Sequence, residues 1–142
     1  MTIKEAIVLG NKSLDNIETK ILLKYVLNKD YSYIVANANK ELNSEEEKTY
    51  ITLLEKVNNG YPLQYITNKQ QFMGEEFYVD ENVLIPQPDT EILVEKTIEI
   101  AKENKANKIL DLCTGSGAIA ISLKKYLPNI EVTASDISKK AL

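Results

Sequence analysis

Apolar residues up to about residue 68 recur at helical spacing, and each apolar group follows a residue that can start a helix. Pairs with the spacing of a capping box stand at these starts: Thr2 with Glu5, Asp15 with Glu18, and Ser44 with Glu47. A short helix is also expected from Ser32, and Pro62 can open another that runs through Ile66. Gly60 is the expected C-terminal cap of the helix before Pro62. The pattern therefore predicts four or five short helices in a small bundle.

The spacing changes at about Gln70, where helical periodicity gives way to short strand-like segments. Residues 71–73 and 77–79 each carry an aromatic residue and flank Gly74-Glu75. This composition predicts a β-hairpin with an aromatic residue in each arm.

A segment with two prolines, Pro86 and Pro88, follows the predicted hairpin. Proline fixes its own φ and restricts the residue before it, so we expect an extended backbone here. Asp89 or Thr90 is then expected to cap a helix that ends near residue 104.

The last part of the chain has the pattern of a βαβ unit. Residues 108–112 are a predicted strand, 115–117 a tight glycine turn, 118–126 a helix and 131–136 a second strand. Two strands and one helix would leave an apolar sheet face and two open edges, and the chain stops six residues later. We therefore expect a fragment of a longer protein, with a second chain that completes the sheet as the alternative.

Three parts follow from these patterns. Residues 1–68 form a helical domain, residues 69–85 a hairpin linker, and residues 86–142 the start of a doubly wound α/β domain.

Composition excludes several kinds of chemistry. The 142 residues carry 17 basic and 21 acidic side chains, a formal net charge of -4 that gives no reason to expect tight nucleic-acid binding. There is no histidine, so Ser-His or Cys-His nucleophile pairs and His-ligated metals are excluded. A single cysteine allows neither an intrachain disulfide nor a cysteine-rich zinc site.

No apolar run reaches the length of a membrane span, and the N-terminus lacks the pattern of a signal peptide.

The glycine turn is the strongest chemical signal. Gly115-Ser116-Gly117 follows a strand that carries Asp111, and Asp136 closes the next strand. Glycines let the backbone approach a ligand, and an acid at the end of the second strand can accept hydrogen bonds from ribose hydroxyls. The pattern indicates a nucleoside-containing ligand, with a plain tight turn as the simpler interpretation.

Two ligand classes fit the turn. Gly115, Gly117 and Ala120 satisfy the dinucleotide fingerprint, with Asp136 at the expected distance, which would indicate NAD. The carboxylate of Asp111 argues against NAD, because it would repel a pyrophosphate. It would instead attract the ammonium and sulfonium charges of S-adenosylmethionine, which we therefore favour.

The sequence resembles the N-terminal half of the PrmC/HemK family of protein-(glutamine-N5) methyltransferases. The resemblance covers nearly the whole chain and rests on these segments: Tyr61–Ile66, Phe72–Gly74, Phe77–Val79, Leu84–Glu91, Asp111–Gly117 and Ala134–Ser138. The glycine turn is shared by many methyltransferases, but the Ile-Pro-x-Pro-Asp-Thr-Glu segment is far more selective.

The resemblance implies a Rossmann-like, S-adenosylmethionine-dependent domain that methylates the glutamine of the Gly-Gly-Gln motif in peptide chain release factors, and so a role in translation termination. It places the methionine part of the cofactor at Cys113, Thr114, Gly115, Ser116 and Gly117, with Asp111 close by. Asp136 would hold the ribose. Pro86, Thr90 and Glu91 would line the pocket near the methyl group.

Three features depart from the family pattern. Gln87 stands where the family usually has arginine, which removes a fixed positive charge. Cys113 stands where glycine is common, so we expect that the backbone there need not take angles restricted to glycine. The family's Asn-Pro-Pro-aromatic substrate motif is absent, so the chain contains no catalytic residue of its own and we expect it to be inactive alone.

Partners follow from the same resemblance. The helical domain would help to grip the release factor, and the full-length enzyme is expected to be a cytoplasmic monomer without membrane or direct nucleic-acid contacts. Two alternatives stay open besides an NAD enzyme. One is an amino-group methyltransferase for nucleic acid or a small molecule, and the other is a stand-alone helical protein-binding module.

Overall fold

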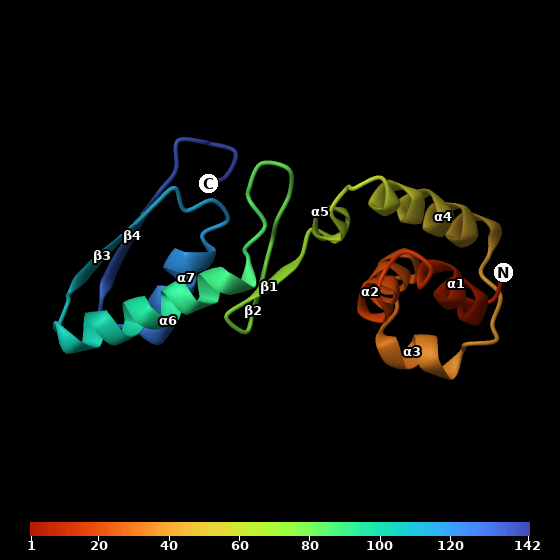
Figure 1. Ribbon diagram of the computed structural model, residues 1–142, viewed down its shortest axis with the longest axis horizontal. Helices are drawn as coiled ribbons and strands as arrows, with labels where there is room; N and C mark the ends of the chain where they lie inside the picture. The colour runs from red at the N-terminus through yellow and green to blue at the C-terminus, as the bar shows by residue number, and fades with distance from the viewer. The chain divides into compact units, whose positions relative to one another are not determined.

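The computed structural model describes residues 1–142, which form two compact units, Met1–Thr67 and Asn68–Leu142 (Figure 1). The first unit contains only helices, and the β-hairpin belongs to the second unit together with the βαβ segment.

The first unit is a bundle of five helices, as the apolar spacing predicted. Its helices are α1 (Ile3–Gly10), α2 (Asn16–Leu27), α3 (Tyr31–Ala36), α4 (Ser44–Asn58) and α5 (Leu63–Thr67). Helix α2 lies at the centre and packs against each of the other four. Its buried Leu22 and Leu23 join Ile3, Ile34 and Leu54 in one apolar core.

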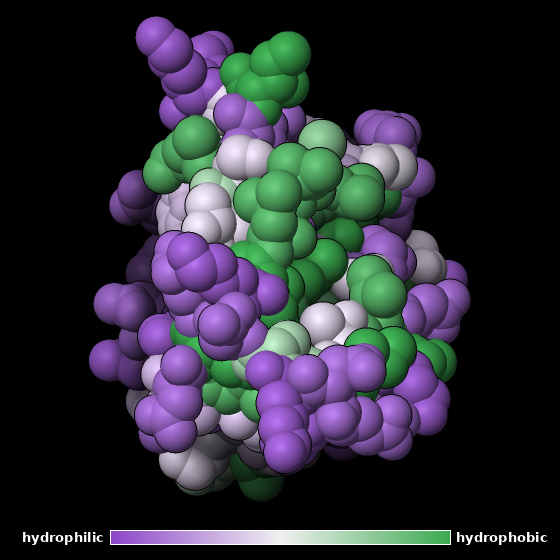
Figure 2. Space-filling view, turned by 90° about the vertical axis from the view of Figure 1, so that its left-hand side faces the viewer, coloured by the Kyte–Doolittle hydropathy of each residue, from purple (hydrophilic) through white to green (hydrophobic).

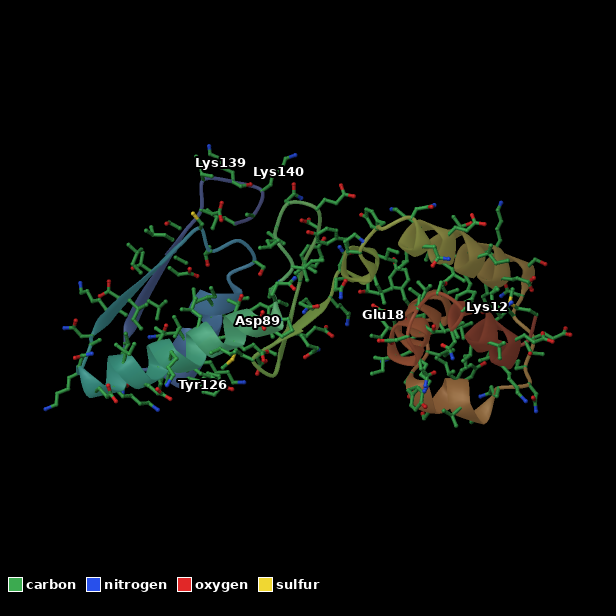
Figure 3. All side chains as sticks on the ribbon, viewed as in Figure 1. Lys12, Glu18, Asp89, Tyr126, Lys139 and Lys140 are labelled. Atoms are coloured by element: carbon green, nitrogen blue, oxygen red, sulfur yellow. The ribbon has the colours of Figure 1, made fainter.

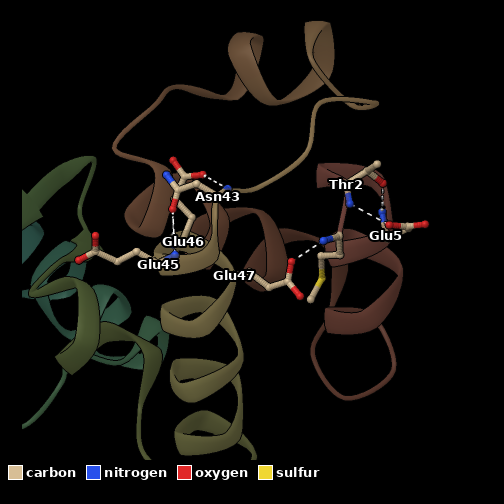
Figure 4. Close-up of polar contacts among 7 residues, drawn as sticks. Thr2, Glu5, Asn43, Glu45, Glu46 and Glu47 are labelled. Atoms are coloured by element: carbon tan, nitrogen blue, oxygen red, sulfur yellow. Dashed lines mark hydrogen bonds and ion pairs between the residues drawn. The ribbon is translucent and has the colours of Figure 1, made fainter.

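The helix starts confirm two of the three predicted capping boxes. Thr2 with Glu5 and Asp15 with Glu18 make both hydrogen bonds of the motif. The third prediction is wrong by one residue. Its cap is Asn43, whose Oδ1 accepts from the backbone N–H groups of Glu45 and Glu46 at 3.0 and 2.9 Å (Figure 4).

Ser44 is therefore the first helical residue of α4 rather than its cap. Glu47 pairs instead with the N-terminal amine of Met1, and this hydrogen bond raises the pKa of the amine (Figure 4). Helix α3 also starts one residue before the predicted Ser32, because Asp30 caps it by accepting from the N–H of Tyr33 at 2.8 Å.

Gly60 ends α4 as the sequence predicted. Its φ is +91°, and its N–H donates to the carbonyl of Val57 at 2.9 Å. The N–H of Tyr61 reaches the carbonyl of Lys56 at 3.2 Å. This pair of bonds is a Schellman motif, in which a residue with positive φ satisfies the last helical carbonyls.

Tyr50 joins α4 to α1 in the core of the first unit. Its side chain is fully buried, and its hydroxyl donates to the carbonyl of Ala6 at 2.8 Å. Burial raises the pKa of Tyr50 to about 12, because the phenolate would lose its hydration there.

The second unit begins with a hairpin of β1 (Gln70–Phe72) and β2 (Glu75–Phe77). Its turn is Met73-Gly74, with φ of +51° and +76°, and not the predicted Gly74-Glu75. Positive φ at both central residues is the geometry of a two-residue type I′ turn, which matches the twist of the strands. The predicted aromatic residue in each arm is confirmed, since the rings of Phe72 and Phe77 meet edge to face at 6.2 Å.

Helix α6 (Pro88–Glu103) follows the extended proline segment. Its N-cap is Gln87, which makes no side-chain capping bond, so the predicted cap at Asp89 or Thr90 is wrong. Pro88 occupies the first helical position, where a missing N–H has no cost and the fixed φ suits a helix. Asp89 lies in the first turn of α6, where its charge complements the helix dipole (Figure 3).

The βαβ unit consists of β3 (Lys108–Leu112), α7 (Ala118–Tyr126) and β4 (Glu131–Ser135), and its two strands are parallel. The first strand and the helix have the predicted bounds. Helices α6 and α7 pack against each other and share a core with both hairpin phenylalanines.

The β3–β4 sheet has apolar side chains that no residue of the chain covers. Ile109 of β3 packs into the core, whereas its neighbours Leu110 and Leu112 are 58% and 67% exposed. Figure 2 views the molecule from the side on which this sheet lies and shows a band of hydrophobic side chains between hydrophilic ones. No helix in the structure combines the length and the apolar character needed to cross a membrane.

Candidate functional site

The candidate site lies at the carboxyl ends of β3 and β4. The two strands pair in register with Leu112 opposite Ser135, and the N–H of Thr114 donates to the carbonyl of Ser135 at 2.9 Å. The glycine turn therefore leaves β3 beside the end of β4. In parallel α/β sheets this edge is where ligands bind.

Asp136 joins the glycine turn to the loop after β4 through its two carboxylate oxygens. Its Oδ2 accepts from the N–H of Gly115 at 2.8 Å, and its Oδ1 accepts from the N–H of Ser138 at 2.8 Å. These bonds, first that from Ser138 and then that from Gly115, hold the pKa of Asp136 below its ordinary value. Each oxygen retains a further lone pair that can accept a hydrogen bond from a hydroxyl.

Asp111 lies one position before the end of β3 and is only 8% exposed. Its Oδ2 accepts from the hydroxyl of Thr114 at 2.6 Å, so the carboxylate faces into the turn. A negative charge held at this depth attracts a cationic group and repels an anionic one.

The backbone of the turn has positive φ at three positions: +63° at Cys113, +55° at Gly115 and +77° at Gly117. Cys113 thus adopts a conformation that glycine favours, contrary to the expectation from its side chain. For residues other than glycine, the left-handed backbone conformation costs roughly 1–2 kcal/mol. The Cys113 side chain is exposed.

Gly117 is the N-cap of α7 and supplies no side-chain bond to the first turn of that helix. The opening N–H groups of a helix have no intrahelical acceptors. The space beside Gly115 in the same turn is open, because a Cβ added to this glycine would meet no atom within 4 Å. The turn therefore offers backbone donors beside open space, which suits a carboxylate or another anionic group.

The structure holds the other predicted residues by different contacts. Glu91 Oε1 accepts from the N–H of Met73 at 2.6 Å, and the carbonyl of Pro86 accepts from Gln70 Nε2 at 3.0 Å. Both contacts lead to the hairpin and not to the glycine turn. Gln87 donates to the carbonyl of Ile85 at 3.0 Å and so stays within its own segment.

A cavity of about 600 Å³ opens between the hairpin, α7 and the loop after β4. Ser116 is the only predicted site residue that lines it. Lys140, in the loop after β4, also borders the cavity (Figure 3). The sequence interpretation missed the remaining lining, which includes Glu75, Phe77, Tyr78, Ile121 and Lys125. The charged and aromatic composition of residues 75–78 was the one sequence signal for this lining. It was not enough to predict the cavity, because only the tertiary fold brings these residues next to α7.

The second unit belongs to the methyltransferase class, since residues 88–142 match the family described as the methyltransferase small domain. Residues 8–67 match the PrmC N-terminal domain. The chain therefore belongs to the PrmC family, as its motifs predicted.

Curated relatives align with most of this chain. A release factor glutamine methyltransferase of Clostridium acetobutylicum is 44% identical over 125 residues, which cover 88% of this chain and 44% of that protein. A release factor glutamine methyltransferase of Borreliella burgdorferi is 42% identical over 130 residues, which cover 92% of this chain and 45% of that protein. A release factor glutamine methyltransferase of Koribacter versatilis is 39% identical over an alignment of 149 residues, which covers 100% of this chain and 53% of that protein. The chain spans about half the length of these relatives.

Proposed function

We propose that the protein is an S-adenosylmethionine-dependent methyltransferase that modifies the glutamine side chain of peptide chain release factors. In this proposal the second unit is the first part of a Rossmann-like cofactor domain. The observation that carries it is the junction of β3 and β4, where Asp136 holds the N–H of Gly115 and Asp111 is buried beneath the turn. The names of the relatives supply the substrate.

The residues of the turn fit the cofactor group by group. Asp111 suits its ammonium group, the N–H groups at the start of α7 suit its carboxylate, and Asp136 suits its ribose hydroxyls. Bound there, S-adenosylmethionine would supply an electrophilic methyl group on a sulfonium. NAD fits less well, because its pyrophosphate would lie against the carboxylate of Asp111.

The chemistry on the substrate side is mainly a matter of positioning. A glutamine amide nitrogen is a weak nucleophile because its lone pair is shared with the carbonyl. Holding that nitrogen in line with the methyl group lowers the barrier to transfer by positioning.

The three-part division assigns a role to each segment. Residues 1–68 would contact the release factor and residues 86–142 would begin the cofactor domain. Residues 69–85 would connect the two, with their hairpin packed in the second unit. We place this activity in the cytoplasm, where release factors act, in a protein that is a monomer at full length.

Methyl transfer to an intact release factor tests the proposal. The complete gene product, incubated with S-adenosylmethionine, should add the mass of one methyl group to the peptide that contains Gly-Gly-Gln. A release factor with that glutamine changed to asparagine is the matched control and should stay unmodified. An unmodified wild-type release factor, or equal methylation of the control, would refute the proposal.

The 142-residue chain alone should give no methylation in the same assay. It lacks the Asn-Pro-Pro-aromatic motif that the family uses to hold the target amide. Turnover by this chain alone would show that the motif is dispensable.

A further inference from the structure

Helix α2 leaves an apolar stripe exposed to solvent. Ile17, Ile21 and Tyr25 follow one another at the i, i+4 spacing, so their side chains lie on one face of the helix. They are 69%, 39% and 48% exposed. The opposite side of α2 carries Leu22 and Leu23, which are fully buried in the core of the first unit. Single apolar residues are common on a surface, but a contiguous apolar stripe is typical of a surface that binds a partner.

Two lysines lie on the same face of α2. Lys20 and Lys24 each follow one of the isoleucines at the i, i+3 spacing, which brings charged and apolar side chains together. Lys20 Nζ donates to the hydroxyl of Tyr31 at 3.0 Å and lies 4.8 Å from the centre of its ring. Tyr31 is the first residue of α3 and is exposed. The surface of α2 therefore continues onto α3, which packs against it (Figure 1).

A second tyrosine of α3 holds two further lysines. Lys29 Nζ lies 5.6 Å and Lys40 Nζ 5.5 Å from the centre of the Tyr33 ring, and Lys40 also donates to the Tyr33 hydroxyl at 2.7 Å. An ammonium group is attracted by the negative potential of an aromatic face. Because these lysines are already held against rings, they lose less conformational entropy when a partner binds.

The carboxylates near these lysines are bound to backbone N–H groups. Asp15 and Glu18 form the capping box at the start of α2, and Asp30 accepts from the N–H of Tyr33 at the start of α3. The bond from Tyr33 is the main reason that the pKa of Asp30 lies below its ordinary value. None of the four lysines on α2 and around α3 takes part in the ion pairs of the structure. Their ammonium groups can therefore pair with the carboxylates of a partner.

The chemistry of this face fits an acidic protein better than a nucleic acid. Apolar side chains next to ammonium groups are complementary to a protein surface on which carboxylates surround an apolar patch. Phosphates would also meet the lysines, but the bases of a single strand stack on flat rings, which Ile17 and Ile21 do not have. The net charge of -4 on the chain also opposes the approach of a polyanion.

We propose that this face of the first unit, the α2–α3 surface, docks an acidic region of the protein that is methylated. The surface consists of Ile17, Lys20, Ile21, Lys24, Tyr25 and Tyr31, with Lys29 and Lys40 at its border. The isoleucines cover apolar side chains of the partner, and the lysines pair with its carboxylates. The inference rests on the proposed function, because that function supplies a protein substrate, the release factor.

The charged part of the surface is tested by methyl transfer from the complete gene product to an intact release factor. Lys24→Glu should raise the KM for the release factor by about tenfold at low salt, because it sets a negative charge against the acidic region. The increase should shrink at high salt, which screens charges. The kcat and the KM for S-adenosylmethionine should not change, since the proposed cofactor site lies in the second unit. Lys48→Glu, at an exposed lysine of α4 outside the surface, is the matched control and should leave every constant unchanged.

The apolar part is tested by Ile17→Ala in the same assay. This change should raise the KM for the release factor by about threefold or more, because less apolar area is buried on docking. The Tm should stay that of the wild type, because Ile17 is exposed in the free protein. Val8→Ala on α1 removes part of an exposed side chain outside the surface and should have no effect.

An unchanged KM for the release factor in both Lys24→Glu and Ile17→Ala would overturn the proposal. A single-stranded RNA that binds the wild-type protein but not Lys24→Glu, with this KM unchanged, would overturn it in favour of nucleic acid.

Binding without turnover separates this inference from the proposed function. Calorimetric titration of the complete gene product with the release factor, in the absence of the methyl donor, should show binding that Lys24→Glu weakens by about tenfold and Lys48→Glu leaves unchanged. A release factor that binds in this way and is never methylated would refute the proposed function alone. A release factor that the wild type and both surface variants bind and methylate equally well would refute the docking role alone.

Discussion

Asp111 and Asp136 show how two carboxylates at one sheet edge take different tasks. Asp111 is buried and accepts from the hydroxyl of Thr114, while Asp136 accepts from two backbone N–H groups. Their positions at the ends of β3 and β4 could be predicted, because the end of a strand is visible in a sequence. The positive φ of Cys113 could not, since it depends on how the turn closes onto β4.

Asp136→Asn should destabilise the glycine turn. An amide has one acceptor oxygen, so it can no longer accept from both Gly115 and Ser138, and its NH₂ group faces one of these donors. Because the folded-state pKa of Asp136 is lowered, its stabilising contribution is complete above the ordinary value of 3.8. That contribution is lost as the pH falls from there through the lowered folded-state pKa.

Thermal unfolding of the second unit as a function of pH measures this effect. We expect Asp136→Asn to lower the Tm at neutral pH and to flatten the fall in Tm between pH about 5 and 2. Asp80→Asn is the control with the same charge change, because Asp80 uses only Oδ1, to accept from Asn82, and an asparagine keeps that acceptor. Equal effects of the two changes would contradict the account.

At the scale of elements, the two strands and the helix of the βαβ unit could be predicted almost to the residue, whereas the starts of α3, α4 and α6 could not. Asn43 and Ser44 are both good caps, and three consecutive glutamates give either one a capping-box partner. The sequence alone cannot choose between registers that differ by one residue. The side chain that bonds the free N–H groups decides, and it is that of Asn43.

Asn43→Ala should therefore lower the free energy of unfolding of the first unit by about 1 kcal/mol. Ser44→Ala, one residue further on, should change it by less than about 0.5 kcal/mol, because Ser44 is exposed and caps nothing. Urea unfolding followed by circular dichroism at helical wavelengths gives both values. The reverse order would mean that Ser44 is the cap after all.

The glycine turn offers a second matched pair. Gly115 and Gly117 both have positive φ, but an added Cβ meets open space at Gly115 and lies 3.2 Å from Ile121 Cδ1 at Gly117. Gly115→Ala should lower the free energy of unfolding of the second unit by about 1 kcal/mol through backbone strain. Gly117→Ala should cost more, because Ile121 must also shift. Urea unfolding monitored by NMR signals of α7 checks the order, and a smaller cost at Gly117 would contradict it.

At the scale of the whole molecule, the sequence indicated the class of ligand through its motifs, and the structure added contacts between distant segments. The bond from Met73 to Glu91 joins residues 18 positions apart, and no periodicity predicts it. The exposed Leu110 and Leu112 of β3 agree with the expectation of an uncovered sheet face. The chain also has no arginine among its 17 basic residues, so every cationic contact it makes uses a lysine or the N-terminus.

Ligand choice by the glycine turn is the central claim, and calorimetric titration of the complete gene product tests it most directly. We expect S-adenosylhomocysteine to bind and NAD to give no binding heat. Asp136→Asn should weaken S-adenosylhomocysteine by about tenfold or more through lost charge-assisted hydrogen bonds. Binding of NAD in place of S-adenosylhomocysteine, or S-adenosylhomocysteine binding that Asp136→Asn leaves unchanged, would contradict the account.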